Sequence, residues 1–207
     1  MEKKTYHHGN LRAALIETGI GIVNEEGTAA CSLRKVAAKC GVSHAAPYSH
    51  FKDKEDLFET MKQYVTQRFA NALNDSIQKC QVETELQTQL GKAYVRFFAE
   101  NPNYFPFLFS QSSFHIDLTS EFDKRESYQP FEMFKNVIVS IMVKKSVPKA
   151  MQRQTLLAMW STVHGIAAIV TMKGVDFDGD WEVMVEKIIS DHLIVAIDPH
   201  WQGGGTE

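Results

Sequence analysis

The 23 residues from Ser32 to Lys54, SLRKVAAKCGVSHAAPYSHFKDK, decide the fold of the first part of this 207-residue chain. Ser32 is a favourable helix N-cap, because its hydroxyl can accept a hydrogen bond from a free N–H of the first turn. Apolar residues then follow at the i, i+3, i+4 and i+7 spacing of a buried helical stripe. They are Leu33, Val36, Ala37 and Cys40. Gly41 tolerates the left-handed conformation that ends a helix, so the pattern predicts one short amphipathic helix.

A second short helix is predicted directly after this glycine turn, capped by Ser43 and continuing to His50. Its side chains are too small and too polar for a core, whereas Phe51 is a candidate anchor into the domain. Small side chains let a helix approach base edges closely. Pro47 lacks a backbone N–H and disfavours helical geometry at the residue before it, so we expect a tight or slightly irregular helix. Together the two helices indicate a DNA-binding helix-turn-helix.

The order of these residues resembles the N-terminal domain of the tetracycline-repressor (TetR) family of bacterial regulators. The matching positions are Ser32-Leu33-Arg34, Val36-Ala37, Gly41-Val42-Ser43, Tyr48 and His50-Phe51-Lys52-Asp53-Lys54. Residues 6–12 look like the start of the family's first helix, which we predict from Asn10 as cap to Asn24, with Gly27 beyond its end. Its predicted inward residues are Leu11, Leu15, Gly19, Ile22 and Val23. The resemblance covers about residues 6–60.

The resemblance implies a set of DNA contacts. Ser32 and Tyr48 are expected at phosphates, and Lys54 is expected to contact a phosphate from the start of the following helix. Arg34 and residues 44–46 are expected to face bases. The full set of candidate DNA-binding residues is Ser32, Arg34, Lys35, Ser43, His44, Ala45, Ala46, Tyr48, His50 and Lys54.

Two positions depart from the family's pattern. Pro47 stands where many members have Leu or Ile. Lys35 stands where a capping-box Glu is the expected residue, and a lysine there is unfavourable for the helix dipole but favourable near DNA.

The charge distribution places DNA binding in the first quarter of the chain. The net charge is −3, yet residues 1–54 contain eight Lys or Arg against five Asp or Glu, and the remaining residues are acidic. Binding is therefore expected to be local to the first part. We predict a helix-turn-helix DNA-binding domain over residues 1–54 and an effector-binding and dimerisation domain over residues 55–207.

No membrane span, metal site or other cofactor is predicted. The longest apolar stretches, such as residues 165–170 and 193–197, fall far short of the about 18 residues of a membrane helix. The N-terminus is polar from the second residue, so we expect no cleavable signal and a location in the bacterial cytoplasm. Cys31, Cys40 and Cys80 lack metal-ligand spacing and are expected to be small buried hydrophobes.

The rest of the chain shows helical periodicity without a sustained alternation of apolar and polar residues, so the predicted fold class is all-α. Asp53 is expected to cap a connector helix that begins near Lys54. Further helices are predicted over residues 83–100, 129–145 and 148–172, and a last one is capped by Asp180.

The last two predicted helices are apolar on more than one face. A helix of this kind must be buried on both sides, and one side therefore needs a partner outside the subunit. The family resemblance implies a homodimer through a four-helix interface built from these two helices. We expect Ala168 and Ile189 in this interface, and the apolar set of the last helix includes His192, Leu193, Val195, Ala196 and Ile197.

A candidate effector site is rich in aromatic residues. Residues 101–109 contain two prolines and four aromatic residues, and we expect irregular backbone there, which seldom fills a bundle interior tightly. Trp160-Ser161-Thr162-Val163-His164-Gly165 resembles the Trp-x-x-x-His-Gly (WHG) signature of one C-terminal domain class in the family. The candidate ligand-binding residues are Phe97, Tyr104, Phe105, Phe109, Phe134, Trp160 and His164. The alternative is that these side chains, including Trp160 and His164, are core residues.

These patterns favour a ligand-responsive transcriptional regulator, a repressor released from a palindromic duplex by a small, mainly apolar effector. The alternative is a DNA-binding regulator controlled by a protein partner, which would show an exposed apolar groove instead of an internal cavity. An enzyme is not predicted, because no Ser/His/Asp order, phosphate-binding glycine loop or His-Glu-x-x-His motif occurs.

Overall fold

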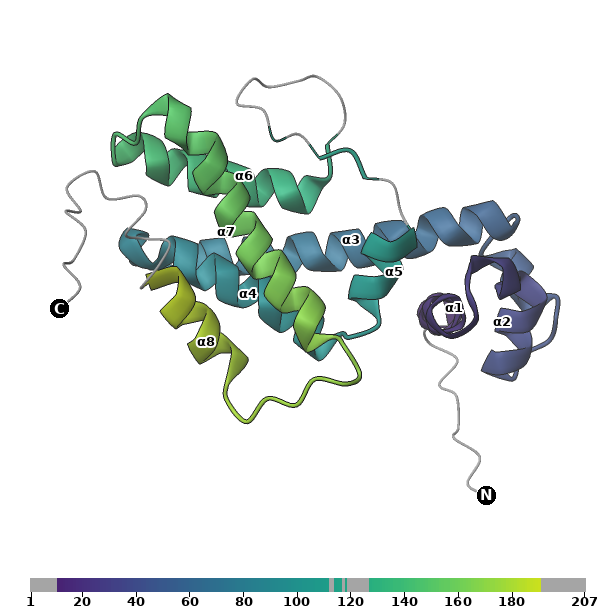
Figure 1. Ribbon diagram of the computed structural model, residues 1–207. Helices are drawn as coiled ribbons and strands as arrows, with labels where there is room; N and C mark the ends of the chain where they lie inside the picture. The colour runs from purple at the N-terminus through teal and green to yellow at the C-terminus, as the bar shows by residue number, and fades with distance from the viewer. Residues whose placement is uncertain (1–10, 112–113, 117, 119–126, 191–207) are drawn as a thin grey trace. The chain divides into compact units, whose positions relative to one another are not determined.

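The computed structural model describes residues 11–111, 114–116, 118 and 127–190. Within these ranges it contains α-helices and short 3-10 helices and no strand (Figure 1), which confirms the all-α class. None of the described helices is both long and apolar enough to cross a membrane. The predicted cap Asn10, the segment from residue 6 to residue 10 and the end of the last predicted helix, residues 192–197, lie outside the described residues.

The chain forms two compact units. The first comprises residues 1–65 and 106–112, and the second comprises residues 66–105 and 113–207. The long helix α3 (Lys54–Lys79) therefore begins in the first unit and ends in the second. The predicted division between residues 54 and 55 into two functional domains stays a prediction.

The first unit is built on α1 (Leu11–Glu26), η1 (Thr28–Ala30), α2 (Leu33–Cys40), η2 (Ala46–Ser49) and the start of α3. Four of the five predicted inward residues of α1 are buried, whereas Leu11 is half-buried because it lies at the helix end. Gly19 brings α1 close to α3, since a Cβ there would lie 2.6 Å from Met61 Sδ. Gly27 follows α1 with φ 84°, a conformation that glycine adopts without strain.

Asp53 starts α3 as predicted. Its carboxylate accepts a hydrogen bond from the Asp56 N–H at 2.8 Å, and the Asp56 carboxylate accepts one from the Lys52 N–H at 2.8 Å. These reciprocal bonds satisfy two N–H groups at the helix end. Phe51 is 1 % exposed, so the predicted anchor is confirmed.

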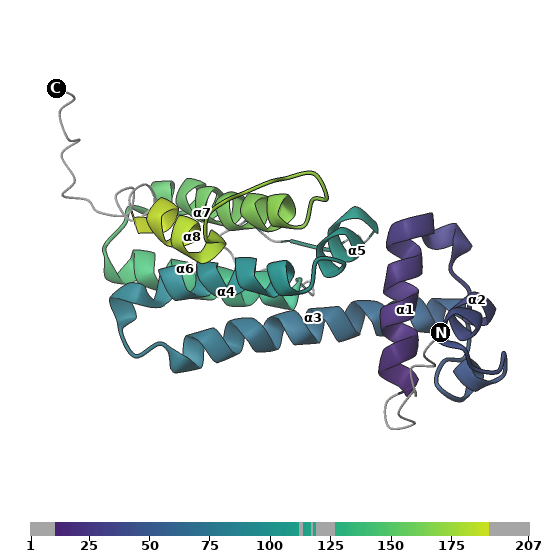
Figure 2. The same ribbon diagram turned by 90° about the horizontal axis from the view of Figure 1, so that it is seen from below.

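The second unit is organised around α4 (Leu86–Glu100), which follows η3 (Glu83–Glu85). It packs against α6 (Gln129–Lys144), α7 (Lys149–Val170) and α8 (Trp181–Ile188). Figure 2 shows α4 between the C-terminal half of α3 and the pair α7 and α8. Gly91 allows this close packing, because a Cβ there would lie 2.4 Å from Ile189 Cδ1 and 3.3 Å from Val163 Cγ1. Asp180 caps α8 as predicted, accepting hydrogen bonds from Glu182 and Val183.

One predicted segment differs from the structure. Residues 104–111 form a regular helix, α5 (Tyr104–Gln111), rather than irregular backbone. Only residues 101–103 form a turn, in which the Tyr104 N–H donates to the Asn101 carbonyl at 2.9 Å. Pro106 is the third residue of α5, a position whose N–H has no partner within the helix in any case. The argument for a cavity from irregular backbone therefore does not apply.

Candidate DNA-binding surface and effector site

Helix α2 forms as its sequence predicts. The Ser32 hydroxyl accepts a hydrogen bond from the Lys35 N–H at 3.2 Å, and all four residues of the predicted stripe are buried. Gly41 has φ 70° and ψ 28°, and the Val42 N–H donates to the Ala37 carbonyl at 3.0 Å. This is a left-handed helix end in which glycine avoids a steric penalty. The end of α2 and the start of the next element are therefore held in a defined geometry.

The second element is shorter than predicted. An α-helix from Ser43 to His50 is not present; residues 41–45 form a turn, and η2 is a 3-10 helix capped by Ala45 without a side-chain bond. The Tyr48 N–H donates to the Ala45 carbonyl at 3.1 Å, and the His50 N–H donates to the Pro47 carbonyl at 2.9 Å. Buried Pro47 has no N–H for an α-helical bond, which favours the tighter 3-10 pattern. The expectation of a tight helix is confirmed.

Most candidate DNA-binding side chains are solvent-exposed. The exposed ones are Ser32, Arg34, Ser43, His44, Ala45, Tyr48 and His50, whereas Lys35, Ala46 and Lys54 are half-buried. Tyr48 is 57 % exposed although tyrosine is a large, partly apolar residue. The exposed phenol is therefore accessible to a phosphate.

Two of the candidate lysines are engaged within the first unit. Lys35 forms an ion pair with Glu26. The Lys54 ammonium donates to the Thr28 carbonyl at 2.9 Å and lies 5.6 Å from the centroid of the Phe58 ring. A phosphate contact by Lys54 would have to compete with these interactions. The sequence pattern did not indicate Thr28 as a partner, since 26 residues separate the two positions.

Several aromatic residues of the second unit form a cluster around His164. The His164 Nδ1 lies 2.9 Å from the Tyr94 hydroxyl. The ring centroids of Phe105 and Trp160 lie 4.9 Å and 5.2 Å from that of His164, and the ring of Phe131 lies 4.9 Å from that of Trp160. The helices α4, α5, α6 and α7 thus all contribute to the cluster.

Burial determines the ionisation of this cluster. It lowers the pKa of His164 below 6.5, because the charged imidazolium loses hydration. Burial also raises the pKa of Tyr94, and a hydrogen bond with Trp160 partly opposes this shift. The pair is therefore neutral near pH 7, and the tautomer of His164 decides which of the two groups donates. Tyr94 is not among the candidate site residues from the sequence, because its sequence position does not reveal which helix it faces.

The remaining candidate ligand residues are packed to different degrees. Phe97 stacks on Phe69 with centroids 4.9 Å apart, and Tyr104 lies 5.8 Å from Phe97. The Phe134 ring lies 6.3 Å from Tyr94. Phe109 is half-buried and belongs to the first unit, so its relation to the other candidate residues stays a prediction. The structure therefore brings Phe105 and Trp160 to His164. Phe134 contacts Tyr94, Phe97 contacts Phe98, which in turn contacts Phe105, and Tyr104 contacts Phe97.

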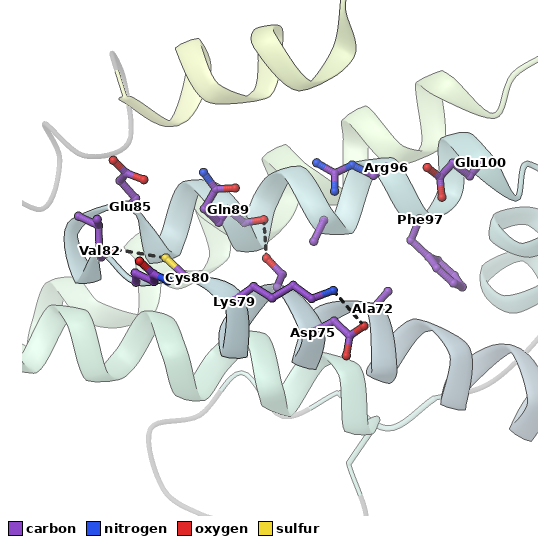
Figure 3. Close-up of a pocket in the computed structure, with 13 residues that line it drawn as sticks. Ala72, Asp75, Lys79, Cys80, Val82, Glu85, Gln89, Arg96, Phe97 and Glu100 are labelled. Atoms are coloured by element: carbon purple, nitrogen blue, oxygen red, sulfur yellow. Dashed lines mark hydrogen bonds and ion pairs between the residues drawn. The ribbon is translucent and has the colours of Figure 1, made fainter.

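A separate cleft of about 550 Å³ lies between the C-terminal half of α3 and α4 (Figure 3). Small residues on facing helices, Ala72 and Ala93, contribute to its lining. Phe97 is the one candidate ligand residue in the described lining, and the Ser76 hydroxyl donates across it to the Gln89 carbonyl at 3.0 Å. Charged side chains surround the cleft, including Asp75, Lys79, Glu85, Arg96 and Glu100. This volume falls in the range of small-molecule sites.

No group of three or more His, Cys, Asp or Glu side chains that could hold a metal ion occurs among the described residues. Cys31 and Cys40 are buried in the first unit, and Cys80 is half-buried.

The chain belongs to the tetracycline-repressor family. The family model for bacterial regulatory proteins of the tetR family matches residues 15–61, which contain α2, η2 and the start of α3. The model for a tetracyclin repressor-like C-terminal domain matches residues 88–192, about half of the chain. The two matched models describe bacterial regulatory proteins and a repressor-like C-terminal domain, which supports a DNA-binding regulator. A search of curated proteins found no match.

Solved structures share the fold at low sequence identity. A bacterial regulatory protein of the tetR family from Rhodococcus RHA1 has a TM-score of 0.63 and 16% identity, covering 89% of this chain and 94% of that chain. A TetR family transcription regulator from Marinobacter aquaeolei VT8 has a TM-score of 0.60 and 21% identity, covering 86% and 91%. The fatty acid degradation regulator FadR from Bacillus halodurans has a TM-score of 0.60 and 14% identity, covering 92% and 100%.

Proposed function

We propose that this DNA-binding regulator is a cytoplasmic repressor, which binds a palindromic operator as a homodimer and is released by a small, mainly apolar effector. The observation that carries the DNA-binding part is the exposed face of α2 and η2. Its side chains are polar or small, and the backbone beneath them is fixed by the Ser32 cap and the left-handed Gly41. A defined backbone with exposed donors is what base recognition needs.

We assign the DNA contacts to the candidate residues of this face. Arg34 is exposed and can make the bidentate hydrogen bonds that recognise guanine. Ser32, Tyr48 and His50 are placed at phosphates, and Lys54 joins them if its ammonium leaves the Thr28 carbonyl.

Exposed apolar residues on α7 and α8 support the homodimer. They include Leu157, Ile169, Val183 and Met184. Gly165 lies on α7 where a Cβ would meet nothing within 4 Å. Packing inside the subunit does not require this glycine, and a glycine within a helix costs about 1 kcal/mol relative to alanine. A closely approaching helix of a second copy would explain it.

One expected interface residue belongs inside the subunit instead. Ile189 is 1 % exposed and lies against Gly91 of α4, so a charge there would test the subunit core rather than the dimer. Ala168 is half-buried and remains a suitable test position.

The effector is assigned to the aromatic cluster around His164. Trp160 and Phe105 offer ring faces, while the Tyr94 and His164 pair offers one polar group to a ligand that replaces their mutual hydrogen bond. Helix α3 is the element that an effector can act on, because this one helix carries Lys54 in the first unit and Phe69 of the aromatic core in the second. The expected coupling between effector and DNA is about 1 to 3 kcal/mol.

The alternative is control by a protein partner, and the cleft between α3 and α4 is the candidate surface for it. This cleft is lined by residues of both helices, among them Phe97 and several charged side chains (Figure 3). Two experiments distinguish the two proposals. Native mass spectrometry of the purified protein detects a bound small molecule. The DNA complex is then exposed to the fraction of a bacterial extract that contains molecules below about 1 kDa. We expect a bound small mass and release of DNA by that fraction. Release by the macromolecular fraction alone would support the protein partner.

A further inference from the structure

A small cavity lies in the second unit, where η3 and the start of α4 meet the end of α6. Its described lining shares no residue with the cleft in Figure 3 and none with the aromatic cluster around His164. The cavity has a volume of about 180 Å³, which equals about six water molecules of about 30 Å³ each, so only a small molecule fits. The lining residues are Glu83, Thr84, Gln87, Ile141, Lys144 and Lys145.

Gln87 is a buried polar residue of this lining whose side-chain oxygen lacks a partner. The residue is 3 % exposed, yet its Oε1 has no hydrogen-bond partner among the described residues. Buried polar groups in proteins are normally hydrogen-bonded, and a buried oxygen without a partner costs free energy. A hydroxyl group of a bound molecule can satisfy the amide in either orientation, because a hydroxyl donates to the amide oxygen and accepts from the amide nitrogen.

The charges around the cavity favour an anion. Lys144 forms an ion pair with Glu83, so these two charges offset each other. Lys145 is half-buried, and its ammonium group has no acidic partner in the part of the chain that the structure describes. The described lining therefore carries one carboxylate against two ammonium groups, a net charge of +1. A carboxylate beside Lys145 would compensate this charge and gain a charge-assisted hydrogen bond.

Apolar surface completes the lining. Ile141 is buried, and the methylene groups of the two lysines add to its surface. We propose that this cavity binds a small monocarboxylate with an apolar body and a hydroxyl group. The carboxylate pairs with Lys145, the hydroxyl bonds to the Gln87 amide, and the apolar body contacts Ile141. This site is separate from the proposed effector site and does not rest on it.

Three compounds of similar size test the proposal. The probe is 4-hydroxybenzoate, which joins the two polar groups through one ring; benzoate lacks only the hydroxyl, and 4-hydroxybenzamide lacks only the charge. NMR titration of the full-length protein measures the three dissociation constants. We expect about 1 mM for the probe, an affinity that about ten non-hydrogen atoms can supply. Benzoate should bind about fivefold more weakly, and 4-hydroxybenzamide at least about tenfold more weakly, because hydrogen bonds to charged groups are the stronger ones.

Two substitutions assign the contacts. Gln87→Leu should remove the difference between 4-hydroxybenzoate and benzoate, and Lys145→Gln should remove the difference between 4-hydroxybenzoate and 4-hydroxybenzamide. Lys149→Gln is the matched control, because Lys149 is an exposed lysine of α7 outside this lining, and it should keep both differences.

Thermal unfolding of the free protein tests the state of the Gln87 amide. Gln87→Leu replaces a buried oxygen that has no partner with apolar atoms, so the unfolding midpoint should stay equal or rise. A lower midpoint would show that the amide is satisfied in the free protein and would contradict the proposal.

The location of the probe is tested with His164→Phe, which alters the aromatic cluster and should leave the affinity for 4-hydroxybenzoate unchanged. Loss of binding in this variant would place the probe in the proposed effector site and overturn the inference. No binding of 4-hydroxybenzoate at about 10 mM, or both differences retained in Gln87→Leu and Lys145→Gln, would overturn it as well.

Discussion

Replacing Gly165 with alanine should affect the free subunit and the dimer in opposite directions. The new methyl group meets no atom within 4 Å in the subunit, so it introduces no clash there. Alanine also favours the helix over glycine by about 1 kcal/mol, which should stabilise the monomer. In a dimer with closely packed α7 helices the same methyl overpacks the interface by about 1 to 3 kcal/mol. The dimer dissociation constant should therefore rise about 5- to 150-fold.

The chain contains a matched control for this substitution. Gly21 lies within α1, and a Cβ there also meets nothing within 4 Å. Gly21→Ala should raise the free energy of unfolding by a similar amount without changing dimerisation. Sedimentation equilibrium over a dilution series measures the dissociation constants, and thermal unfolding at low protein concentration measures the stability of the monomers. If Gly165→Ala leaves the dissociation constant at the level of Gly21→Ala, the interface does not include this face of α7.

Three further predictions concern α4, the aromatic cluster and Lys54. Gly91→Ala places a methyl group against Ile189, so urea unfolding should show a loss of about 1 to 3 kcal/mol, and an unchanged midpoint would contradict the close packing. Because burial lowers the pKa of His164, this histidine takes up a proton in the unfolded state before it does so in the folded state as the pH falls. The free energy of unfolding should therefore decrease below pH 6.5 and level off below the lowered pKa. An identical dependence of this free energy on pH in His164→Phe would contradict the prediction. Lys54→Gln removes the hydrogen bond to the Thr28 carbonyl and should lower the free energy of unfolding by about 1 kcal/mol. If this substitution leaves the slope of log DNA affinity against log salt concentration unchanged, Lys54 does not contact a phosphate.

Those parts of the fold that depend only on residues close together in the sequence were predictable from the sequence. The cap at Ser32, the buried stripe of α2 and the left-handed Gly41 all follow from local rules, and each is present in the structure. Phe51 as an anchor and Asp180 as a cap follow in the same way.

The effects of the two prolines were predicted with unequal success. Pro47 makes η2 a 3-10 helix, in agreement with the expected tight geometry, although the element begins later than Ser43. Pro106 does not interrupt the chain, because α5 starts only two residues before it. Whether a proline breaks a helix depends on where that helix begins, and the turn over residues 101–103 sets this start.

The contacts within the candidate sites depend on packing between distant segments. Tyr94 meets His164 although 70 residues separate them, and Lys54 meets Thr28 across 26 residues. Helical periodicity identifies Tyr94 as an inward residue but does not select its partner, since the arrangement of α4 against α7 decides it. For this reason the sequence indicated the residue types of the aromatic cluster without its central hydrogen bond.

The affinity of the protein for a selected palindromic duplex, compared with a scrambled duplex over a range of salt concentrations, tests the central claim most directly. Fluorescence anisotropy should show much tighter binding to the selected duplex and a steep loss of affinity with salt. Arg34→Ala should remove about 1 to 3 kcal/mol from binding to the selected duplex and much less from the scrambled one, whereas Arg153→Ala, an exposed arginine of α7, should match wild type. Equal affinity for both duplexes, or equal losses on both for Arg34→Ala, would contradict sequence-specific recognition by this face.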